Sequence, residues 1–239
     1  FTDLMEVQGR LIYFDGDENL NHIVAGLRRD IVPFAYNTPK HEVRNGITYL
    51  KTKKAEVPLK IFGEHNLQNM EAARLACRQI GVTDQQFYSV IKDFPGASNR
   101  LQKIVETEKA VAFKDFAHSP SKLKATVNAV KSQFLDRQLI ACMELHTFSS
   151  LTEDFLPQYA ACMEQADMAF VYYNPEVIQH KRLKDIEPEQ VKKAFGGNNL
   201  EVFTDSAALQ AKLRSLNYDN TALLFMTSGN FSGVQLIEF

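Results

Sequence analysis

The chain shows two patterns of apolar and polar positions, and one replaces the other part-way along. In the first part, short apolar runs predict strands over residues 11–14 and 31–36. Two further runs, over residues 47–50 and 57–61, flank a charged turn and predict a pair of antiparallel strands. Pro58 has no backbone N–H to donate, so it places the second strand of this pair at a sheet edge.

The helices of this first part are marked by a different spacing. Over residues 67–80 apolar side chains recur every three or four positions, which predicts a helix that Gly81 ends. Shorter helices are predicted over residues 21–28 and 84–92. Pro, Gly and Ser then cluster at residues 94–98, which is the best candidate for a domain boundary.

Beyond this boundary, strands and helices alternate. Such alternation is typical of βαβ units, so we expect an α/β fold with a mostly parallel, Rossmann-like sheet and helices on both faces. Ser119 and Pro120 are suited to begin one of these helices. The strands are predicted at residues 103–106, 110–115, 139–143, 168–173, 200–203 and 222–227, and the remaining helices at 154–166, 187–195 and 206–216.

Composition and charge narrow the class of protein. The net charge of −2 provides no broad attraction to nucleic acid or to an anionic membrane, so neither is expected as a partner. The apolar runs are too short to cross a bilayer, and no signal peptide is visible. Cys77, Cys142 and Cys162 lie in apolar stretches without metal-type spacing. We therefore expect buried, reduced thiols, no metal site and a cytoplasmic protein.

Polar residues at the start of the helix after Gly63 are the first candidate site. Asn66 and Asn69 lie three positions apart, so they share a face of the first turn next to His65. A primary amide both donates and accepts hydrogen bonds, which matches the edge of adenine. The simpler interpretation, which spacing alone favours, is that Asn66 caps the helix and His65 lies in a loop.

A second candidate follows the strand at residues 110–115. The Asp115 carboxylate is placed to accept hydrogen bonds from a ribose diol, and His118 lies near a helix N-terminus, where phosphate or a metal-bound oxygen is favoured. A solvated turn is an equal alternative. Arg100, at the domain boundary, has a fork of donors suited to phosphate, although exposed arginines more often pair with an acidic neighbour.

Two more polar groups follow strands of the same predicted sheet. Glu144, His146 and the loop that begins at Thr227 all lie at strand ends, where ligands of parallel sheets bind. His146 is equally well explained as a satisfied polar residue, and the loop as a simple turn. The pair Gly196–Gly197 is predicted to stop a helix rather than to bind phosphate, because no strand precedes it.

Together these motifs resemble the Mur ligases, the ATP-dependent amide-forming enzymes of peptidoglycan synthesis. The resemblance runs the full length of the chain. It is carried by residues 63–73, 94–96 with Arg100, 115–120, 124–126 and 226–231. It implies ATP and Mg²⁺ as cofactors, and a reaction in which ATP phosphorylates a carboxylate that an amine then attacks.

The resemblance also implies roles for individual residues. His65, Asn66 and Asn69 would border the adenine of ATP, and Asp115 would hold the ribose hydroxyls. Arg100 would contact the ATP phosphates or the acyl-phosphate, and His118 would lie near the phosphates. The incoming amine substrate would face His146, Thr227, Ser228 and Asn230.

Within the family, the chain most resembles the branch that acts on UDP-N-acetylmuramate. Overall similarity favours the ligase that attaches the peptide L-alanyl-γ-D-glutamyl-meso-diaminopimelate, and the alternative is the ligase that adds L-alanine. The motif at residues 144–147 agrees only partly with either ligase, which leaves the peptide substrate open. Two further positions depart from the family pattern. Family members often have a second histidine where Ser119 stands, and a second arginine where Asn99 stands.

A Gly-rich phosphate loop ending in Gly-Lys-Thr or Gly-Lys-Ser should accompany these motifs, but none of the 11 glycines is followed by Lys. We therefore interpret residues 1–97 as the C-terminal part of a P-loop-type ATPase domain and residues 98–239 as the Mur ligase C-terminal domain. The missing N-terminal domains would be partners within the same protein, and this chain alone is expected not to hydrolyse ATP. The rival interpretations are a folylpolyglutamate or cyanophycin synthetase and a non-catalytic nucleotide-binding module.

Overall fold

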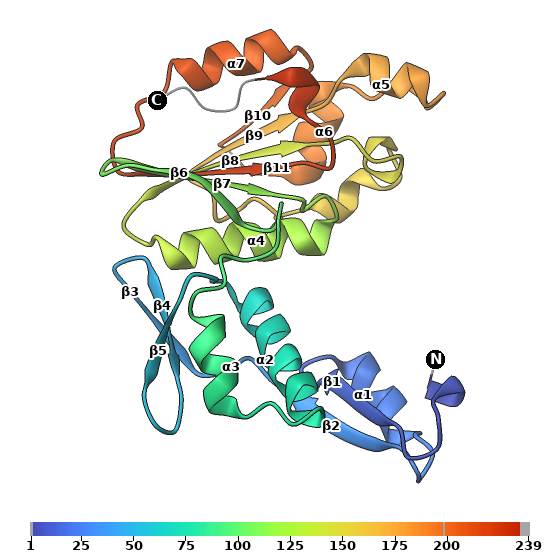
Figure 1. The fold of residues 1–239 in the computed structure, drawn as a ribbon. Coiled ribbons are helices and arrows are strands. Elements are labelled where there is room, and N and C mark those ends of the chain that lie inside the picture. The colour runs from blue at the N-terminus through green and yellow to red at the C-terminus, as the bar shows by residue number, and fades with distance from the viewer. Residues whose placement is uncertain (1, 198, 235–239) are drawn as a thin grey trace. The chain divides into compact units, whose positions relative to one another are not determined.

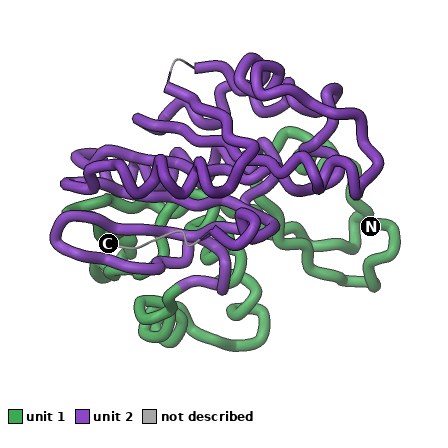
Figure 2. The backbone as a smooth tube through the Cα atoms, turned by 90° about the horizontal axis from the view of Figure 1, so that it is seen from above, with its two compact units in different colours: residues 1–95 green, residues 96–239 purple. Residues whose placement is uncertain are grey.

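The computed structural model describes residues 2–197 and 199–234. The chain divides into two compact units, residues 1–95 and 96–239, which are described separately (Figure 2). The division falls within the stretch rich in Pro, Gly and Ser at residues 94–98.

The first unit contains two small sheets (Figure 1). Strands β1 (Arg10–Phe14) and β2 (Val32–Tyr36) are parallel, and α1 (Glu18–Ala25) connects them. The second sheet is antiparallel and consists of β3 (His41–Arg44), β4 (Ile47–Lys51) and β5 (Glu56–Leu59). Pro58 pairs with Tyr49 in β5, an edge strand of this sheet, as its missing N–H predicts.

Helix α2 (Glu64–Gln79) is the longest helix of this unit. It buries Leu67 and Met70 against the antiparallel sheet, and Gly81, which follows the C-cap residue Ile80, has a φ of +91°. The Gly81 N–H donates to Arg78 O, and the next N–H donates to Cys77 O, the bond pair that ends a helix in the left-handed conformation. Thr83 then caps α3 (Asp84–Ile91) through a reciprocal bond with Gln86.

The second unit is built on a six-stranded sheet in the order β10-β9-β8-β11-β7-β6. Only β6 is antiparallel to its neighbour, so the predicted α/β fold with a mostly parallel sheet is confirmed. The strands are β6 (Gln102–Glu106), β7 (Ala110–Asp115), β8 (Gln138–Glu144), β9 (Met168–Tyr172), β10 (Leu200–Phe203) and β11 (Thr221–Met226). The helices are α4 (Pro120–Gln133), α5 (Pro175–His180), α6 (Pro188–Phe195) and α7 (Ser206–Arg214).

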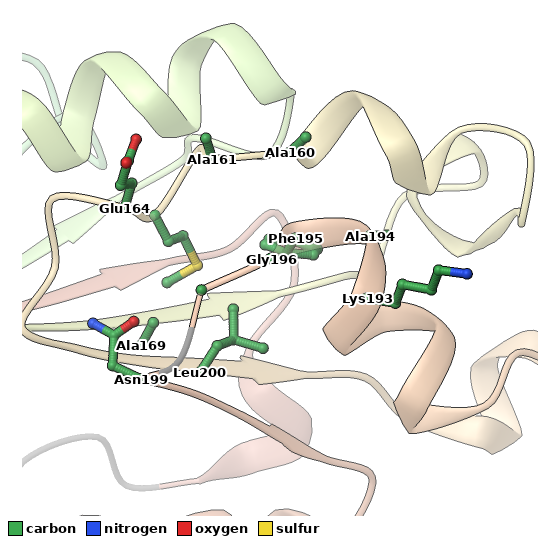
Figure 3. A pocket seen from close by; sticks show the side chains of 12 residues that line it. Ala160, Ala161, Glu164, Ala169, Lys193, Ala194, Phe195, Gly196, Asn199 and Leu200 are labelled. Atoms are coloured by element: carbon green, nitrogen blue, oxygen red, sulfur yellow. The ribbon is translucent and has the colours of Figure 1, made fainter.

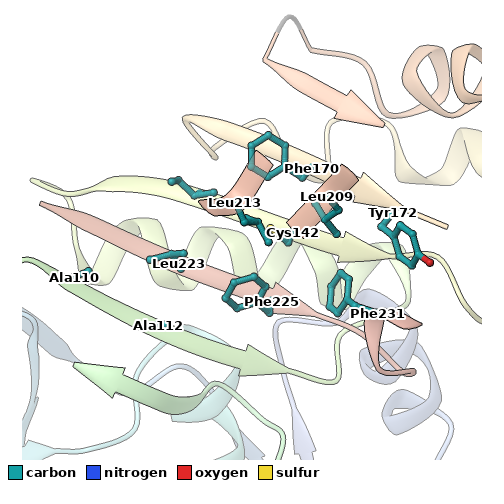
Figure 4. Packing of buried hydrophobic residues seen from close by; sticks show 11 residues of the cluster. Ala110, Ala112, Cys142, Phe170, Tyr172, Leu209, Leu213, Leu223, Phe225 and Phe231 are labelled. Atoms are coloured by element: carbon teal, nitrogen blue, oxygen red, sulfur yellow. The ribbon is translucent and has the colours of Figure 1, made fainter. Parts of the chain in front are cut away.

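Helices cover both faces of this sheet, with α4 on one side and α7 on the other (Figure 1). Alternate strand residues point to α7, whose Leu209 and Leu213 pack on them together with Phe231 (Figure 4). Helix α4 contacts β8 and β11 and buries Leu123 and Val127 completely. The central strands are apolar on both faces because both faces are covered.

The helix predicted over residues 154–166 is wrong. This segment forms a short 3₁₀ helix, η3 (Leu156–Tyr159), followed by turns. Pro157 has no N–H for an internal helical bond, and Ala161 adopts a φ of +57°, which no α-helix accommodates. The Ala161 N–H donates instead to Phe195 O at the end of α6, so a long-range contact replaces a local bond.

Strand β3 and helix α5 were not predicted from the sequence, because each is short and lacks a clear apolar period. The cysteines are free thiols; Cys142 and Cys162 are buried as predicted, but Cys77 is only half-buried. In the part of the chain that the structure describes, no helix combines the length and apolar character needed to cross a membrane.

Candidate functional site

Three neighbouring strands of the second unit end at the same level and bring distant polar residues together. Asp115, Met226 and Met143 are in register across β7, β11 and β8. Glu144 ends β8, and Thr227 directly follows β11, with its N–H donating to Asp115 O at 3.0 Å. The carboxyl edge of these strands is therefore where the predicted residues of the second unit meet.

Asp115 is almost fully buried, at 7% exposure, and both of its carboxylate oxygens accept backbone hydrogen bonds. Oδ2 accepts from the Leu101 N–H at 2.7 Å and Oδ1 from the Ala117 N–H at 2.6 Å. Burial raises the pKa of the Asp115 carboxyl, while the two N–H bonds and the charges of Arg100 and Lys122 offset part of that rise. Asp115 thus ties together two loops, and ribose would have to use its remaining lone pairs.

The loop before β6 is held to the loop after β7 in a strained conformation. Asn99 and Leu101 have φ values of +55° and +43°, in the left-handed region that disfavours their side chains. Asn99 O accepts from the Phe116 N–H at 2.8 Å. Arg100, between these two strained residues, is exposed and lies near enough to Asp115 to lower the pKa of its carboxyl. The charge of Arg100 is thereby placed at the carboxyl edge of the sheet.

His118 lies just before α4, next to the Ser119 N-cap. Its Nδ1 lies 2.9 Å from Phe116 O, and because a carbonyl oxygen only accepts, Nδ1 is the donor of this bond. The ring meets the exposed Phe116 ring edge-to-face at 5.0 Å. The Tyr159 hydroxyl donates to His118 O at 2.6 Å, which holds the loop between β7 and α4 in place.

The loop after β11 is bonded to the end of β8. The Glu144 Oε2 accepts from the Thr227 hydroxyl and from the Phe231 N–H. The hydroxyl oxygen of Ser228 is buried and has no hydrogen-bond partner among the described residues. His146 is partly exposed, and its Nδ1 lies 3.7 Å from the Glu144 Oε1. Of the four predicted amine-site residues, Thr227 and His146 thus lie next to one buried carboxylate, whereas Ser228 and the exposed Asn230 belong to the loop that it holds.

The predicted adenine residues belong to the first unit, at the start of α2. Helix capping by Asn66 is wrong, because Gly63 is the N-cap and no side chain bonds to its amides. The Asn66 Nδ2 donates to Phe62 O at 2.9 Å, which uses one of its two N–H groups. Asn69 is exposed and His65 is half-buried. All three residues lie within the first two turns of α2.

A separate pocket of about 240 Å³ lies where β9 and β10 begin, at the opposite edge of the sheet (Figure 3). Its lining is mostly apolar, with Glu164 and Lys193 as charged members. Gly196 ends α6 at this pocket with a φ of +70°, which confirms the predicted helix stop. The pocket contains none of the predicted site residues and is smaller than the roughly 300 Å³ at which small-molecule sites begin. Across residues 2–197 and 199–234, no cluster of three or more His, Cys, Asp or Glu side chains could hold a metal ion.

Glu144 is the residue of this edge to which the sequence assigned no role. The signal was present, since a carboxylate that ends an otherwise apolar strand is costly to bury without partners. Its partners are 83 and 87 residues away in the chain, so no local pattern identifies them.

Comparison with known proteins identifies the family of this chain. The family model described as "Mur ligase, glutamate ligase domain" matches residues 99–229. The UDP-N-acetylmuramate–L-alanine ligase of Pelodictyon phaeoclathratiforme is 28% identical over 187 residues, which cover 74% of this chain and 38% of that protein. The enzyme of the same name from Lactiplantibacillus plantarum is 24% identical, covering 98% of this chain and 50% of that protein. The chain thus spans about half or less of the length of these relatives.

Solved structures share the fold. The UDP-N-acetylmuramate–alanine ligase of Thermotoga maritima has a TM-score of 0.67 at 16% identity and covers 93% of this chain and 49% of that one. A murein peptide ligase from Psychrobacter arcticus has a TM-score of 0.57 at 19% identity and covers 95% and 50%. The MurF ligase of Thermotoga maritima, solved in complex with ADP, has a TM-score of 0.68 at 15% identity and covers 95% and 51%.

Proposed function

Because the chain belongs to the Mur ligase family through its glutamate ligase domain, we propose that it is part of an ATP-dependent ligase of peptidoglycan synthesis. The proposed reaction transfers the terminal phosphoryl group of ATP to the carboxylate of UDP-N-acetylmuramate. An amine nitrogen then bonds to the carbonyl carbon, and inorganic phosphate leaves as the amide forms. The whole protein would work in the cytoplasm, where both nucleotides are found.

One observation carries this proposal. The matched region contains Asp115, Glu144 and Thr227, and the fold brings these residues to one edge of the sheet. A cluster of this kind at the carboxyl edge of parallel strands is where α/β proteins bind ligands. The ADP bound by the related MurF ligase supports a nucleotide as one of these ligands.

We assign the following tasks to the residues of this chain. Arg100 stabilises negative charge on the phosphate oxygens, because a guanidinium offers several donors in a fixed geometry. His118 lies in the loop after β7, which the Phe116 N–H ties to Asn99 O before β6, and it contacts the phosphates through its ring. Asp115 keeps both loops in place and reaches the ribose. His65, Asn66 and Asn69, from the first unit, border the adenine.

The amine substrate has two candidates. The motif resemblance favours the tripeptide L-alanyl-γ-D-glutamyl-meso-diaminopimelate, which is the substrate of a murein peptide ligase. The names of the curated relatives favour L-alanine. In either case the amine meets His146, Thr227, Ser228 and Asn230. Mg²⁺ would accompany ATP, and we assign it no ligand among the described residues, which contain no suitable cluster.

The test is a competition assay on the intact gene product that contains this chain. ATP and UDP-N-acetylmuramate are supplied with equal concentrations of L-alanine and the tripeptide, and the amide products are measured by mass spectrometry. The tripeptide adduct is expected. Formation of the L-alanine adduct instead would identify L-alanine as the amine substrate. Product formed from folate in place of UDP-N-acetylmuramate would indicate a folylpolyglutamate synthetase. The absence of product with any acid would refute the proposed ligase activity.

A pair of variants tests the role of the site. Arg100→Ala is expected to lower kcat by about a hundredfold or more, since it removes donors to developing charge. Arg29→Ala is the matched control, because Arg29 is also exposed and has no part in the proposed site. Residues 1–239 alone are expected to show no ATP hydrolysis, and measurable turnover by that chain would contradict our assignment of residues 1–97.

A further inference from the structure

The Glu144 carboxylate closes the loop of residues 227–231. Its side chain is 3% exposed, and its Oε2 accepts both the Thr227 hydroxyl and the Phe231 N–H, the latter at 2.9 Å. Thr227 begins the loop and Phe231 ends it. Because a buried carboxylate is costly without hydrogen bonds, these contacts hold the two ends of the loop to one oxygen.

The loop needs this restraint because its backbone is strained. Phe231 and Ser232 have φ values of +51° and +52°, in the left-handed region that side chains disfavour. The Phe231 ring is fully buried and lies near the rings of Tyr172 and Phe225 in the core (Figure 4). The packing of Phe231 in the core and its bond to the Glu144 carboxylate thus hold the loop in a conformation that it would not keep without them.

Gly229 packs the middle of the loop directly onto this carboxylate. Its N–H donates to the Thr227 Oγ1 at 2.7 Å. A Cβ at Gly229 would lie 2.9 Å from the Glu144 Oε2 and 3.0 Å from the His146 Cγ and Nδ1. The loop, Glu144 and His146 therefore form one closely packed unit with no room for a side chain at this position.

The second oxygen of the carboxylate faces His146. The Glu144 Oε1 lies 3.7 Å from the His146 Nδ1, and the His146 side chain is 38% exposed whereas Glu144 is nearly inaccessible. One carboxylate thus adjoins both the loop and the imidazole, the two groups that we assign to the amine substrate. Its negative charge lies next to His146 and the loop, so it would attract a positively charged ammonium that binds to them.

We propose that Glu144 is the positioning residue of the amine-substrate site, a role that rests on the proposed function. Glu144 does not touch the substrate. It keeps the Ser228 hydroxyl and the His146 ring in the orientation that receives a primary amine, and its charge favours the ammonium form as the substrate enters. A glutamine at this position has the same shape but lacks the charge and one acceptor oxygen.

Kinetics of Glu144→Gln in the intact gene product test this role. The KM for the amine substrate is expected to rise roughly tenfold, because the amide oxygen of glutamine can still accept both loop bonds but carries no charge, and hydrogen bonds to a charged acceptor are the stronger ones. The KM values for ATP and UDP-N-acetylmuramate are expected to stay unchanged, which a general loss of folding would not produce. Glu108→Gln is the matched control, since Glu108 is an exposed glutamate in the turn between β6 and β7.

A second variant guards against misfolding of the first. Thr227→Val removes the hydroxyl but keeps the shape, and it is expected to raise the same KM. Because both residues act through one loop, the double variant should lose much less than the product of the two single effects. In residues 1–239 alone, Glu144→Gln should speed hydrogen exchange of the Phe231 amide.

The outcomes separate this role from the proposed function. A wild-type protein that forms no amide refutes the proposed function, whereas the exchange experiment still tests whether Glu144 holds the loop. An active wild type whose two variants keep the normal KM for the amine overturns the positioning role. So do variants in which all three KM values rise together, because that pattern indicates a structural role alone.

Discussion

Asp115→Asn is the substitution that most directly tests how the carboxyl edge is held together. The carboxylate accepts one N–H from Leu101 at 2.7 Å and one from Ala117 at 2.6 Å. The amide of the variant has a single acceptor oxygen, and its NH₂ group must face the other backbone N–H. Two donors then meet, so one buried N–H loses its partner.

The expected loss of stability follows from this geometry. An unsatisfied buried donor costs roughly 1–3 kcal/mol, and removal of the buried charge offsets part of that cost. We therefore expect the free energy of unfolding of the variant to be about 1–2 kcal/mol lower than that of the wild type near neutral pH. The Leu101 and Ala117 amides should also lose protection against hydrogen exchange, whereas amides of the first unit should not.

The pH dependence of this difference has a definite sign. The pKa of Asp115 is raised in the folded protein, chiefly by burial, so the folded state binds its proton more readily than the unfolded chain does. The stabilisation from this group is fully present below the ordinary pKa of 3.8 and is lost as the pH rises through the folded pKa. The advantage of the wild type over the variant, which does not titrate here, should therefore grow as the pH falls.

Urea denaturation of residues 1–239 near pH 7 and near pH 4 measures this difference. The chain has no tryptophan, so far-UV circular dichroism follows the unfolding. The reasoning is refuted if the advantage of the wild type shrinks on acidification. That result would mean that the two N–H bonds outweigh burial and lower the pKa of Asp115.

Three further substitutions test other parts of the structure by the same denaturation assay. Leu123→Ala should cost about 2–5 kcal/mol because Leu123 is completely buried under the sheet, and a loss below about 1 kcal/mol would contradict this packing. Gly81→Ala should cost about 1–2 kcal/mol from backbone strain alone, since its φ is +91° and no atom lies within 4 Å of the added Cβ. Asp167→Asn should show a pH dependence opposite to that of Asp115→Asn. Burial opposes ionisation of Asp167, but the hydrogen bonds from Lys131 and the Leu139 N–H lower its pKa in the folded protein. The stabilisation from Asp167 should therefore fade as the pH falls through the folded pKa.

The local pattern of the sequence determined most elements of the fold. Apolar runs and their spacing predicted five parallel strands, and Gly81 and Gly196 marked helix ends because glycine alone tolerates the required φ at little cost. These features depend on neighbours within a few residues, so they are readable without the fold. The helix predicted at residues 154–166 does not form, although the composition of this segment favours one. Pro157 cannot donate a helical hydrogen bond, and the Ala161 N–H bonds to Phe195 O instead.

The sequence also determined which chemical groups the edge of the sheet contains, since Asp115, His118, His146 and Thr227 all lie at or just after the ends of predicted strands. Only the tertiary structure decided which of these groups meet. Strand β11 comes last in the chain but inserts between β7 and β8, and this order carries Thr227 to Glu144 across 83 residues. A pairing of that range is set by the strand order of the whole sheet, because it depends on which strands are neighbours and not on any adjacent residue.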